Sequence, residues 1–561
     1  MVHERDGGRA RPGPAAYHVR VGGAVATGAR DRSEYFLVGA ASIAFAAPLL
    51  LSPYPPGSDM PWHGAVVAVL AERDPSRFLG AFEADGGAGS YVAVYQALAL
   101  LARAVGPAGA LQILCALYVA GFVWGARALA RSFGADGALA LLAAPAAYST
   151  TLEFGFVIYL VSFPLTLWLW ALVRQVMQRG ARPGRVAALA ASWLAICLAH
   201  PFAATVAALG AALLWLCELS RERAGRAALV GAVLCAGAVP AALALAAASS
   251  GSDGPGPIPG LAGASFWDRL TTQVFVPPLE SIARAPFHLI GFASPAWRCA
   301  LCAALAAVAV AWRLASPAPA PAPSPALAGP TASRRAALYL ALLLAALYLV
   351  TPFTVRLATQ LVGAQPRILP LLWVAALVAL RPGAGGAHEA RRQRWPRWAA
   401  LGASAGALAC LALQALLPHA AEARDLAAVI ARAPAARRTL GLIEQRPALD
   451  REPPDSFRNA TAWMVAERGG LAAYLPMSEL RGPDSGQHIP VHPAPGAPPI
   501  PAAPQLGWPH AFRWERHAAG WDQFLIRDLD PSHRFDYFAG HAGQVKEVAR
   551  AGRWRLVRRL E

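Results

Sequence analysis

Long apolar blocks alternate with short polar segments from residue 35 to residue 417. The blocks have 13 to 23 residues, and the longer ones reach the length of about 20 that an α-helix needs to cross the hydrocarbon of a bilayer. The blocks cover approximately 35–52, 107–126, 137–149, 154–173, 186–199, 203–218, 227–249, 299–314, 336–352, 367–380 and 399–417. This pattern predicts an all-α polytopic membrane protein with about eleven transmembrane helices.

Both ends of the chain depart from that pattern. Residues 1–34 are polar and rich in arginine, without the apolar stretch of a signal peptide, and we expect them to form a disordered cytoplasmic segment. Residues 418–561 mix alternating runs with helical spacing, which predicts a small α/β domain. In this tail we expect strands at 438–444, 521–530 and 554–560, with QVKEVARAG (544–552) as a helix between the last two.

Composition supports a membrane protein and changes the meaning of the charge. Of the 561 residues, 56% are apolar and 15% are charged, whereas soluble domains average roughly 45–50% and about 25%. A net charge of +17 would indicate nucleic-acid binding in a soluble chain. Here the arginines cluster in short loops between apolar blocks, so we expect no nucleic-acid partner and treat the charge as a determinant of membrane topology.

The arginines define that topology. If the N-terminus is cytoplasmic, the inside loops contain seventeen arginines, whereas the short outside loops contain only Arg356. Such a bias follows the positive-inside rule. Counting residues 91–105 as a span would invert every later loop, so we predict that this helix lies along the outer face of the membrane.

Three substantial pieces then lie outside. They are the loops 53–106 and 250–298 and the tail 418–561, so residues 35–417 form the transmembrane domain and any chemistry faces outward. The alanine-, glycine- and arginine-rich composition is typical of a GC-rich bacterial genome. We therefore expect a multi-pass protein of the bacterial inner membrane with a periplasmic C-terminal domain.

The first outer loop contains a carboxylate beside the membrane. Pro53, Pro55 and Pro56 end the first helix, and Asp59 and His63 follow. Asp59 precedes Pro61 and an apolar run, so it can be a helix cap. His63 lies four residues further on, on the same face of the first turn, so the two side chains can equally act as base and orienting partner or bind a divalent cation.

The arrangement of these parts resembles the GT-C superfamily of membrane glycosyltransferases. One span leads into a long outer loop with an acidic residue just past the membrane, and a surface helix, many spans and an outer C-terminal domain follow. The resemblance implies that Asp59 is the catalytic base or a metal-proximal carboxylate and that the partner is a polyprenyl-phosphate-linked sugar in the membrane. Two motifs depart from the family, since Asp59-Met60 stands for Asp-Glu and Ser90-Tyr91-Val92 for Pro-Pro-Leu.

Other polar residues near the outer face are candidates for substrate binding. Arg356 and Arg367 flank a short outside loop, where an arginine either extends to ordinary lipid headgroups or binds a lipid phosphate. His200 lies in a His-Pro turn and Glu153 in a very short outside turn, and each is either a turn residue or part of a site. Asp85 precedes a glycine run and is either a solvated loop acid or a substrate contact.

The leading hypothesis is an inverting glycosyltransferase on the outer face of the inner membrane, with Asp59 as base or metal ligand and His63 as its partner. Mg²⁺ or Mn²⁺ can share the neutralisation of the leaving phosphate, since hard cations prefer carboxylate and phosphate oxygens. The alternatives are a non-catalytic or differently catalytic protein of envelope polymer or lipid handling, and a transporter. No predicted span carries a charge at mid-membrane, which argues against transport.

Overall fold

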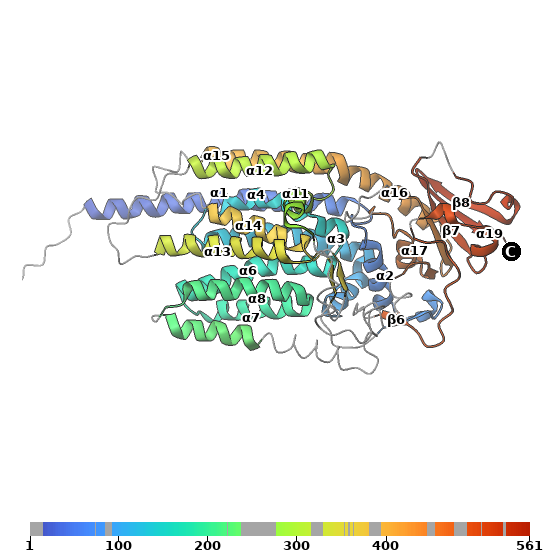
Figure 1. The fold of residues 1–561 in the computed structure, drawn as a ribbon, viewed down its shortest axis with the longest axis horizontal. Coiled ribbons are helices and arrows are strands. Elements are labelled where there is room, and N and C mark those ends of the chain that lie inside the picture. The colour runs from blue at the N-terminus through green and yellow to red at the C-terminus, as the bar shows by residue number, and fades with distance from the viewer. Residues whose placement is uncertain are drawn as a thin grey trace, which may run out of the picture.

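The computed structural model contains a bundle of roughly parallel helix axes with a small sheet domain at one end (Figure 1). It describes residues 15–72, 74–84, 92–220, 223–236, 276–315, 329–352, 354–356, 360–362, 364–380, 394–445, 455–475, 491–506, 508–530 and 535–560. Within these residues the predicted fold class is confirmed: a helical membrane domain is followed by a C-terminal α/β domain.

The bundle is built from helices of unequal length. Its main members are α1 (Ala15–Leu51), α3 (Val92–Ser132), α6 (Val157–Arg179), α7 (Pro183–Ala199), α8 (Pro201–Glu218), α12 (Pro295–Ala315), α13 (Gly329–Val350), α14 (Leu369–Leu380) and α15 (Arg394–Leu411). Among the described residues, seven helical segments are long and apolar enough to cross a membrane, and four shorter apolar helices accompany them.

Two predicted helices differ in detail from the structure. The predicted span 137–149 is not one helix but a buried series of short pieces, η2 (Gly137–Leu139), α4 (Ala140–Ala143) and η3 (Ala144–Tyr148). Pro145 interrupts the helical hydrogen bonds there because proline has no backbone N–H to donate. The predicted surface helix and the next predicted span form one element, α3, which kinks between them where Gly106 takes a non-helical φ of 78° directly before Pro107. That residues 92–105 lie along the membrane surface stays a prediction.

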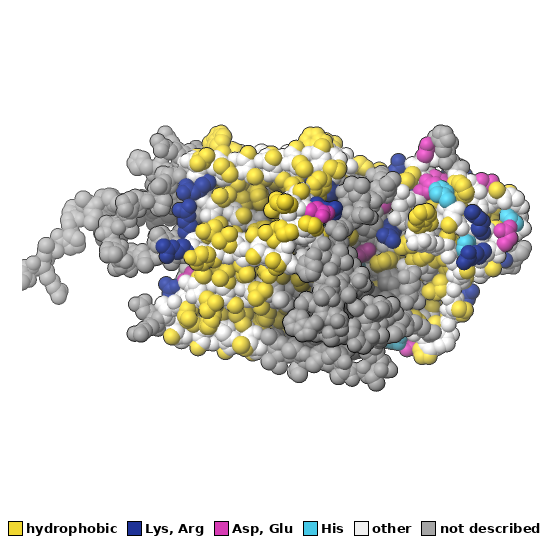
Figure 2. All heavy atoms as spheres, viewed as in Figure 1, with side chains coloured by type: hydrophobic (Ala, Val, Ile, Leu, Met, Phe, Trp, Pro, Cys, Tyr) yellow, Lys and Arg dark blue, Asp and Glu magenta, His cyan; other side chains and the backbone are white. Residues whose placement is uncertain are grey.

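Basic side chains of the helical bundle gather at its end opposite the sheet domain, and the sheet domain carries basic side chains of its own (Figure 2). Several basic side chains of the bundle pair with buried acids. The pairs are Glu34 with Arg127 and Arg131, Glu218 with Arg174 and Arg223, and Asp136 with Arg397. Clustering at one end agrees with the positive-inside assignment. That this end is cytoplasmic stays a prediction.

The C-terminal sheet has five strands in the order β5-β4-β7-β9-β8. They are β4 (Arg438–Ile443), β5 (Leu471–Ala472), β7 (Gln523–Arg527), β8 (Val545–Ala551) and β9 (Trp554–Arg559). The first three are parallel neighbours, and β9 and β8 add antiparallel strands. The three predicted strands are confirmed. The predicted helix at 544–552 is wrong, because Gly552 (φ 52°) turns the chain so that 545–551 pairs with β9 as a hairpin.

Several contacts join the sheet domain to the membrane domain, and two of them are formed by regular elements of the chain. Helix α16 (Leu417–Ala431) continues from α15 through a π turn at Ala412–Leu416, and it packs on β8 and β9. Strand β1 (Phe82–Ala84) of the first outer loop pairs with β6 (Val491–Pro493) of the tail. The first outer loop and the C-terminal domain are therefore built against each other.

Candidate functional site

Asp59 lies between α1 and α2 (Met60–Ala71), on a backbone held by another loop. Its amide donates to the Phe154 carbonyl (3.0 Å), and the Ser58 amide donates to the Glu153 carbonyl (3.0 Å). Asp59 occupies the N-cap position of α2, but its side chain makes no cap hydrogen bond. The capping role that the sequence allows is therefore not the use of this carboxylate.

Two glycines permit the close approach of these loops. Gly57 has φ 136°, and a Cβ there would lie 2.9 Å from the Gly155 Cα and the Leu152 carbonyl oxygen. Gly155 has φ 82°, and its Cβ would lie 2.9 Å from the Met60 nitrogen. Only glycine tolerates both the backbone conformation and the contact. The turn after α5 (Thr150–Phe154) thereby fixes the backbone under Asp59.

Opposing influences act on the Asp59 carboxyl. Burial raises its pKa to about 7, while the positive charges of Arg458 and Arg367 and the Ser58 hydroxyl partly offset that rise. Near neutral pH the group is divided between acid and carboxylate. A carboxylate with such a pKa is a better proton acceptor than an exposed aspartate, and it is suited to general base catalysis.

Arg367 reaches this site from the segment before α14. It lies in η5 (Pro366–Ile368) and is 4% exposed. Its Nη1 is 3.1 Å from His200 Nε2, and its guanidinium carbon is 3.9 Å from the centre of the Phe156 ring. The structure therefore places Arg367 beside His200, and the sequence predicts each of them independently as a candidate for substrate binding. His200 also accepts from the Phe202 amide, so it caps α8 as well.

Arg458 comes from the C-terminal domain, and no sequence pattern predicts its role. It precedes α17 (Thr461–Arg468), and its neighbour Asn459 donates through Nδ2 to the Ser58 carbonyl at 2.8 Å. This bond joins residues 401 positions apart. No local spacing signals such a contact, because an arginine before a helix in a polar tail is typical of a solvated helix end.

The α2–α17 interface holds Arg458 in place. Trp463 stacks on Tyr54 of the first loop with ring centres 4.6 Å apart. It also packs against Gly64 of α2, where a Cβ would come within 2.3 Å of the indole. At the far end of the same interface the Gly470 amide donates to the Arg77 carbonyl at 2.7 Å. Both ends of α17 are thus fastened to the first outer loop.

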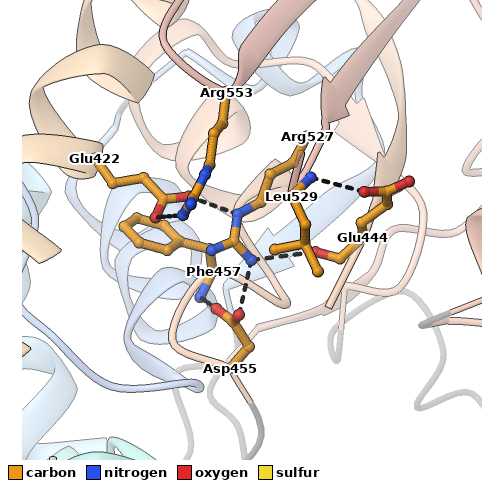
Figure 3. A network of polar contacts seen from close by, with 7 residues as sticks. All are labelled: Glu422, Glu444, Asp455, Phe457, Arg527, Leu529 and Arg553. Carbon is orange, nitrogen blue, oxygen red and sulfur yellow. Dashed lines mark hydrogen bonds and ion pairs between the residues drawn. The ribbon is translucent and has the colours of Figure 1, made fainter. Parts of the chain in front are cut away.

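A buried ionic network supports the segment that carries Arg458 (Figure 3). Arg527 of β7 is 1% exposed, and it pairs with Glu422 of α16 (2.6 Å) and with Asp455 (2.8 Å). Asp455 in turn accepts from the Phe457 amide at 2.9 Å. One guanidinium therefore connects the sheet, the helix leaving the membrane domain and the strand-to-helix segment 455–460.

His63 lies beside Asp59 but is engaged elsewhere. Its Nδ1 is 2.7 Å from the Tyr95 hydroxyl of α3. Burial lowers its pKa to about 4, and a hydrogen bond to the Gly155 backbone opposes this only in part, so the ring is neutral at physiological pH. The backbone amide of His63 donates to the Asp59 carbonyl at 3.1 Å. Direct pairing of the two side chains remains a prediction.

The side chains of the other candidates either pair with another residue or lie outside the described residues. Glu153 pairs with Arg298 of α12 at 3.0 Å and so has a structural partner. Arg356 ends strand β2 (Thr354–Arg356), but its side chain lies outside the described residues. Asp85 also lies outside them. Their predicted roles in substrate binding stay predictions.

The donors around Asp59 do not fit a Mg²⁺ or Mn²⁺ site. Within the described part of the chain there is no group of three His, Cys, Asp or Glu side chains that can hold a metal ion. Mg²⁺ requires near-octahedral oxygen coordination. The charged groups that act on Asp59 are instead the guanidinium groups of Arg458 and Arg367.

These features define a multi-pass membrane protein whose C-terminal α/β domain packs against a partly buried ionic site in the first outer loop. No protein-family model and no curated protein matches the chain. Among solved structures it is similar to ArnT from Cupriavidus metallidurans bound to undecaprenyl phosphate, with a TM-score of 0.48, 12% identity and coverage of 93% of this chain and 97% of that one. The same protein in the apo state gives a TM-score of 0.46 at 12% identity and the same coverage. At these values neither structure carries an activity or a ligand over to this chain.

Proposed function

We propose that this protein is a membrane glycosyltransferase that moves a sugar from a polyprenyl-phosphate carrier to an acceptor on the outer face of the inner membrane. The observation that carries the proposal is the Asp59 site itself. Burial raises the pKa of one carboxyl to about 7, and the positive charges of Arg458 and Arg367 act on it, where the first outer loop meets the C-terminal domain. Transfer from a phosphate leaving group requires a base that accepts the proton of the acceptor hydroxyl and cations that stabilise the leaving phosphate.

Asp59 acts as the general base. The acceptor hydroxyl oxygen attacks the anomeric carbon and gives its proton to the Asp59 carboxylate as the new glycosidic bond forms. The bond between that carbon and the carrier phosphate oxygen breaks, and its electron pair leaves with the polyprenyl phosphate. The displacement inverts the anomeric configuration, and the proton on Asp59 later passes to solvent.

Arg367 stabilises the leaving phosphate. Its guanidinium is buried at the end of η5, directly before the apolar helix α14, which suits a lipid-linked anion. Guanidinium groups bind phosphate oxygens in bidentate geometry, and burial strengthens the attraction because water does not screen it. The contact with His200 and the Phe156 ring holds the guanidinium in one orientation.

An Asp59→Asn variant tests the proposal. Purified protein is supplied with a panel of polyprenyl-phosphate sugars and envelope acceptors, and release of free polyprenyl phosphate is measured. We expect wild-type release with at least one donor and a loss of about 10²-fold or more in the variant, the range for removal of a general base. Asp74→Asn is the matched control, because Asp74 lies in the same loop but is exposed and only caps a short turn.

Wild-type turnover by Asp59→Asn would remove Asp59 from the mechanism. Release by neither protein with any donor of the panel would count against the transferase function. Insertion and folding of both variants are checked by thermal unfolding, so that a loss of turnover is assigned to chemistry.

A further inference from the structure

Arg298, at the start of α12, is joined to the turn that holds Asp59. Its Nη2 donates to the Glu153 carboxylate at 3.0 Å, and both side chains are largely buried, with exposed fractions of 11% and 15%. Its Nη1 donates to the Phe287 carbonyl at 3.0 Å, and its Nε donates to the Ala293 carbonyl. Because all three nitrogens of the guanidinium are engaged, the side chain is held in one orientation.

The second large outer loop, residues 250–298, forms two further bonds with this turn. The Thr150 hydroxyl donates to the Phe287 carbonyl at 2.6 Å, and the Gly291 amide donates to the Tyr148 carbonyl at 2.6 Å. Phe287 lies in α11, the helix that ends at Leu289, and the bond from position 291 comes from the segment between α11 and α12. The turn is therefore attached to both helices and to the chain that joins them.

The same turn holds the backbone of Ser58 and Asp59. The Ser58 amide donates to the Glu153 carbonyl and the Asp59 amide donates to the Phe154 carbonyl, each at 3.0 Å. The Ser58 hydroxyl also donates to the Phe154 carbonyl, at 2.9 Å. Glu153 therefore binds Arg298 through its carboxylate and Ser58 through its carbonyl.

The turn depends on this external support because it is short. Helix α5 has five residues and ends at Gly155 in a left-handed conformation, and a helix of this length is not stable alone. The Asp59 side chain makes no capping hydrogen bond, so the position of its carboxyl follows that of its backbone. A displacement of Arg298 is then transmitted through one turn to Asp59.

We propose that the Arg298–Glu153 ion pair positions Asp59 for catalysis, by fixing the α5 turn to which the Ser58 and Asp59 backbone is bonded. The role of Asp59 as the base rests on the proposed function, whereas the link from Arg298 to Asp59 rests on the hydrogen bonds above. Glu153 then acts through the turn and not on the substrate. Helix α12 and the second large outer loop thereby help to place a group of the first outer loop.

Amide hydrogen exchange of the full-length protein in detergent tests the link without any substrate. Three prolines leave few amides in residues 53–59, so exchange at Ser58 and Asp59 is resolved in short peptides by mass spectrometry. We expect Arg298→Gln to speed this exchange about tenfold or more. Glu153→Gln should speed it less, because the amide still offers Arg298 a neutral acceptor. Exchange in β4 and β7 should stay unchanged, whereas a general loss of stability would raise it as well.

Arg284→Gln is the matched control. It breaks another ion pair of the same loop, Glu280–Arg284 at 2.7 Å, in which the side chains are 36% and 31% exposed. Such exposed pairs contribute little to stability. This variant should therefore leave both the exchange at Ser58 and the turnover unchanged.

Turnover shows whether the link serves the reaction. With a donor and acceptor that the wild type uses, we expect Arg298→Gln to lower kcat about 10-fold to 10²-fold with little change in KM, because misplacing a reacting group costs rate. Arg298→Lys, which keeps the charge but not the fork of donors, should retain part of kcat. In the Asp59→Asn background Arg298→Gln should lower kcat no further, because it acts through the base.

Unchanged exchange at Ser58 and Asp59 in folded Arg298→Gln would overturn the proposal. A raised KM with wild-type kcat in Glu153→Gln would make Glu153 a substrate contact, and an equal loss of turnover in the Asp59→Asn background would make the effect of Arg298 a general one; either result would overturn it too. Should Arg298→Gln fail to fold, Arg298→Lys and Glu153→Gln provide the same comparisons. Turnover that persists in Asp59→Asn refutes the proposed function, while the exchange result still decides whether the pair fixes the Asp59 backbone.

Discussion

At the scale of single residues, the central feature is the Asp59 carboxyl, whose pKa is raised by burial and lowered by the charges of two arginines. Burial disfavours the charged form of Asp59, whereas Arg458 and Arg367 favour it. Without the cations the group would be a neutral acid, and without the burial it would be a weak base. The pKa of about 7 results from both, and a change in either is measurable.

The first prediction concerns the pH dependence of turnover. Asp59 accepts a proton only as the carboxylate, so kcat/KM should fall tenfold per pH unit below about 7. Arg458→Gln removes a charge that lowers this pKa, so the acidic limb should move to higher pH. Arg432→Gln should leave the limb in place. A limb that stays in place in folded Arg458→Gln would show that Arg458 does not act on the base.

The second prediction separates stability from function. The folded pKa of Asp59 lies above its unfolded value, so the native state loses stability as pH rises from about 4 to about 7. Asp59→Asn removes this loss, so its Tm at pH 8 should equal or exceed that of the wild type, with no gain at pH 4. Asp455→Asn should instead lose about 1–3 kcal/mol, because it deprives buried Arg527 of a partner. A lower Tm for Asp59→Asn at pH 8 would contradict the argument.

At the scale of elements, the structure places α17 of the tail on α2 of the first outer loop. The contact depends on Gly64, because any Cβ there would come within 2.3 Å of Trp463. The short helix α17 is too small to be stable alone. Its position is determined by this contact and by the network around Arg527.

The third prediction follows from that contact. Gly64→Ala should loosen the α2–α17 interface, lower turnover and raise proteolytic cleavage within residues 455–475. Gly402→Ala in α15 is the matched control, because a Cβ there meets nothing within 4 Å. Replacing Trp463 by the smaller Phe in the Gly64→Ala background should restore part of the protection. Equal cleavage of both alanine variants would argue against a docked interface.

The elements also show what the sequence can predict. Apolar blocks revealed most helices, because length and hydropathy are local properties, and alternation revealed β4, β7 and β9. Strand β8 was mistaken for a helix because its spacing fits both periods, and only the pairing with β9 decides between them. Asp59 was predictable from its place after the first span. Arg458 was not, because its position depends on a contact across 401 residues.

At the scale of the whole molecule, basic side chains of the helical bundle gather at the end opposite the sheet domain (Figure 2). Helices α2 and α17, which Asp59 and Arg458 precede, lie instead on the side of the sheet domain (Figure 1). The positive-inside rule assigns the arginine-rich end to the cytoplasm. With that orientation, the proposed function requires the Asp59 site to face outward, where the proposed lipid-linked sugar and envelope acceptor meet.

The fourth prediction tests this orientation. Alkaline phosphatase, which is active only when exported, is fused after residue 560 or within the arginine-rich loop after Gly180. We expect activity from the first fusion and none from the second, and a fluorescent protein that folds only in the cytoplasm should give the reverse. An active fusion after Gly180 would place the arginines outside and would require the site to open to the cytoplasm. Because donor and acceptor must reach Asp59 from the same side, that result would exclude an outer-face transferase even if the ionic site were intact.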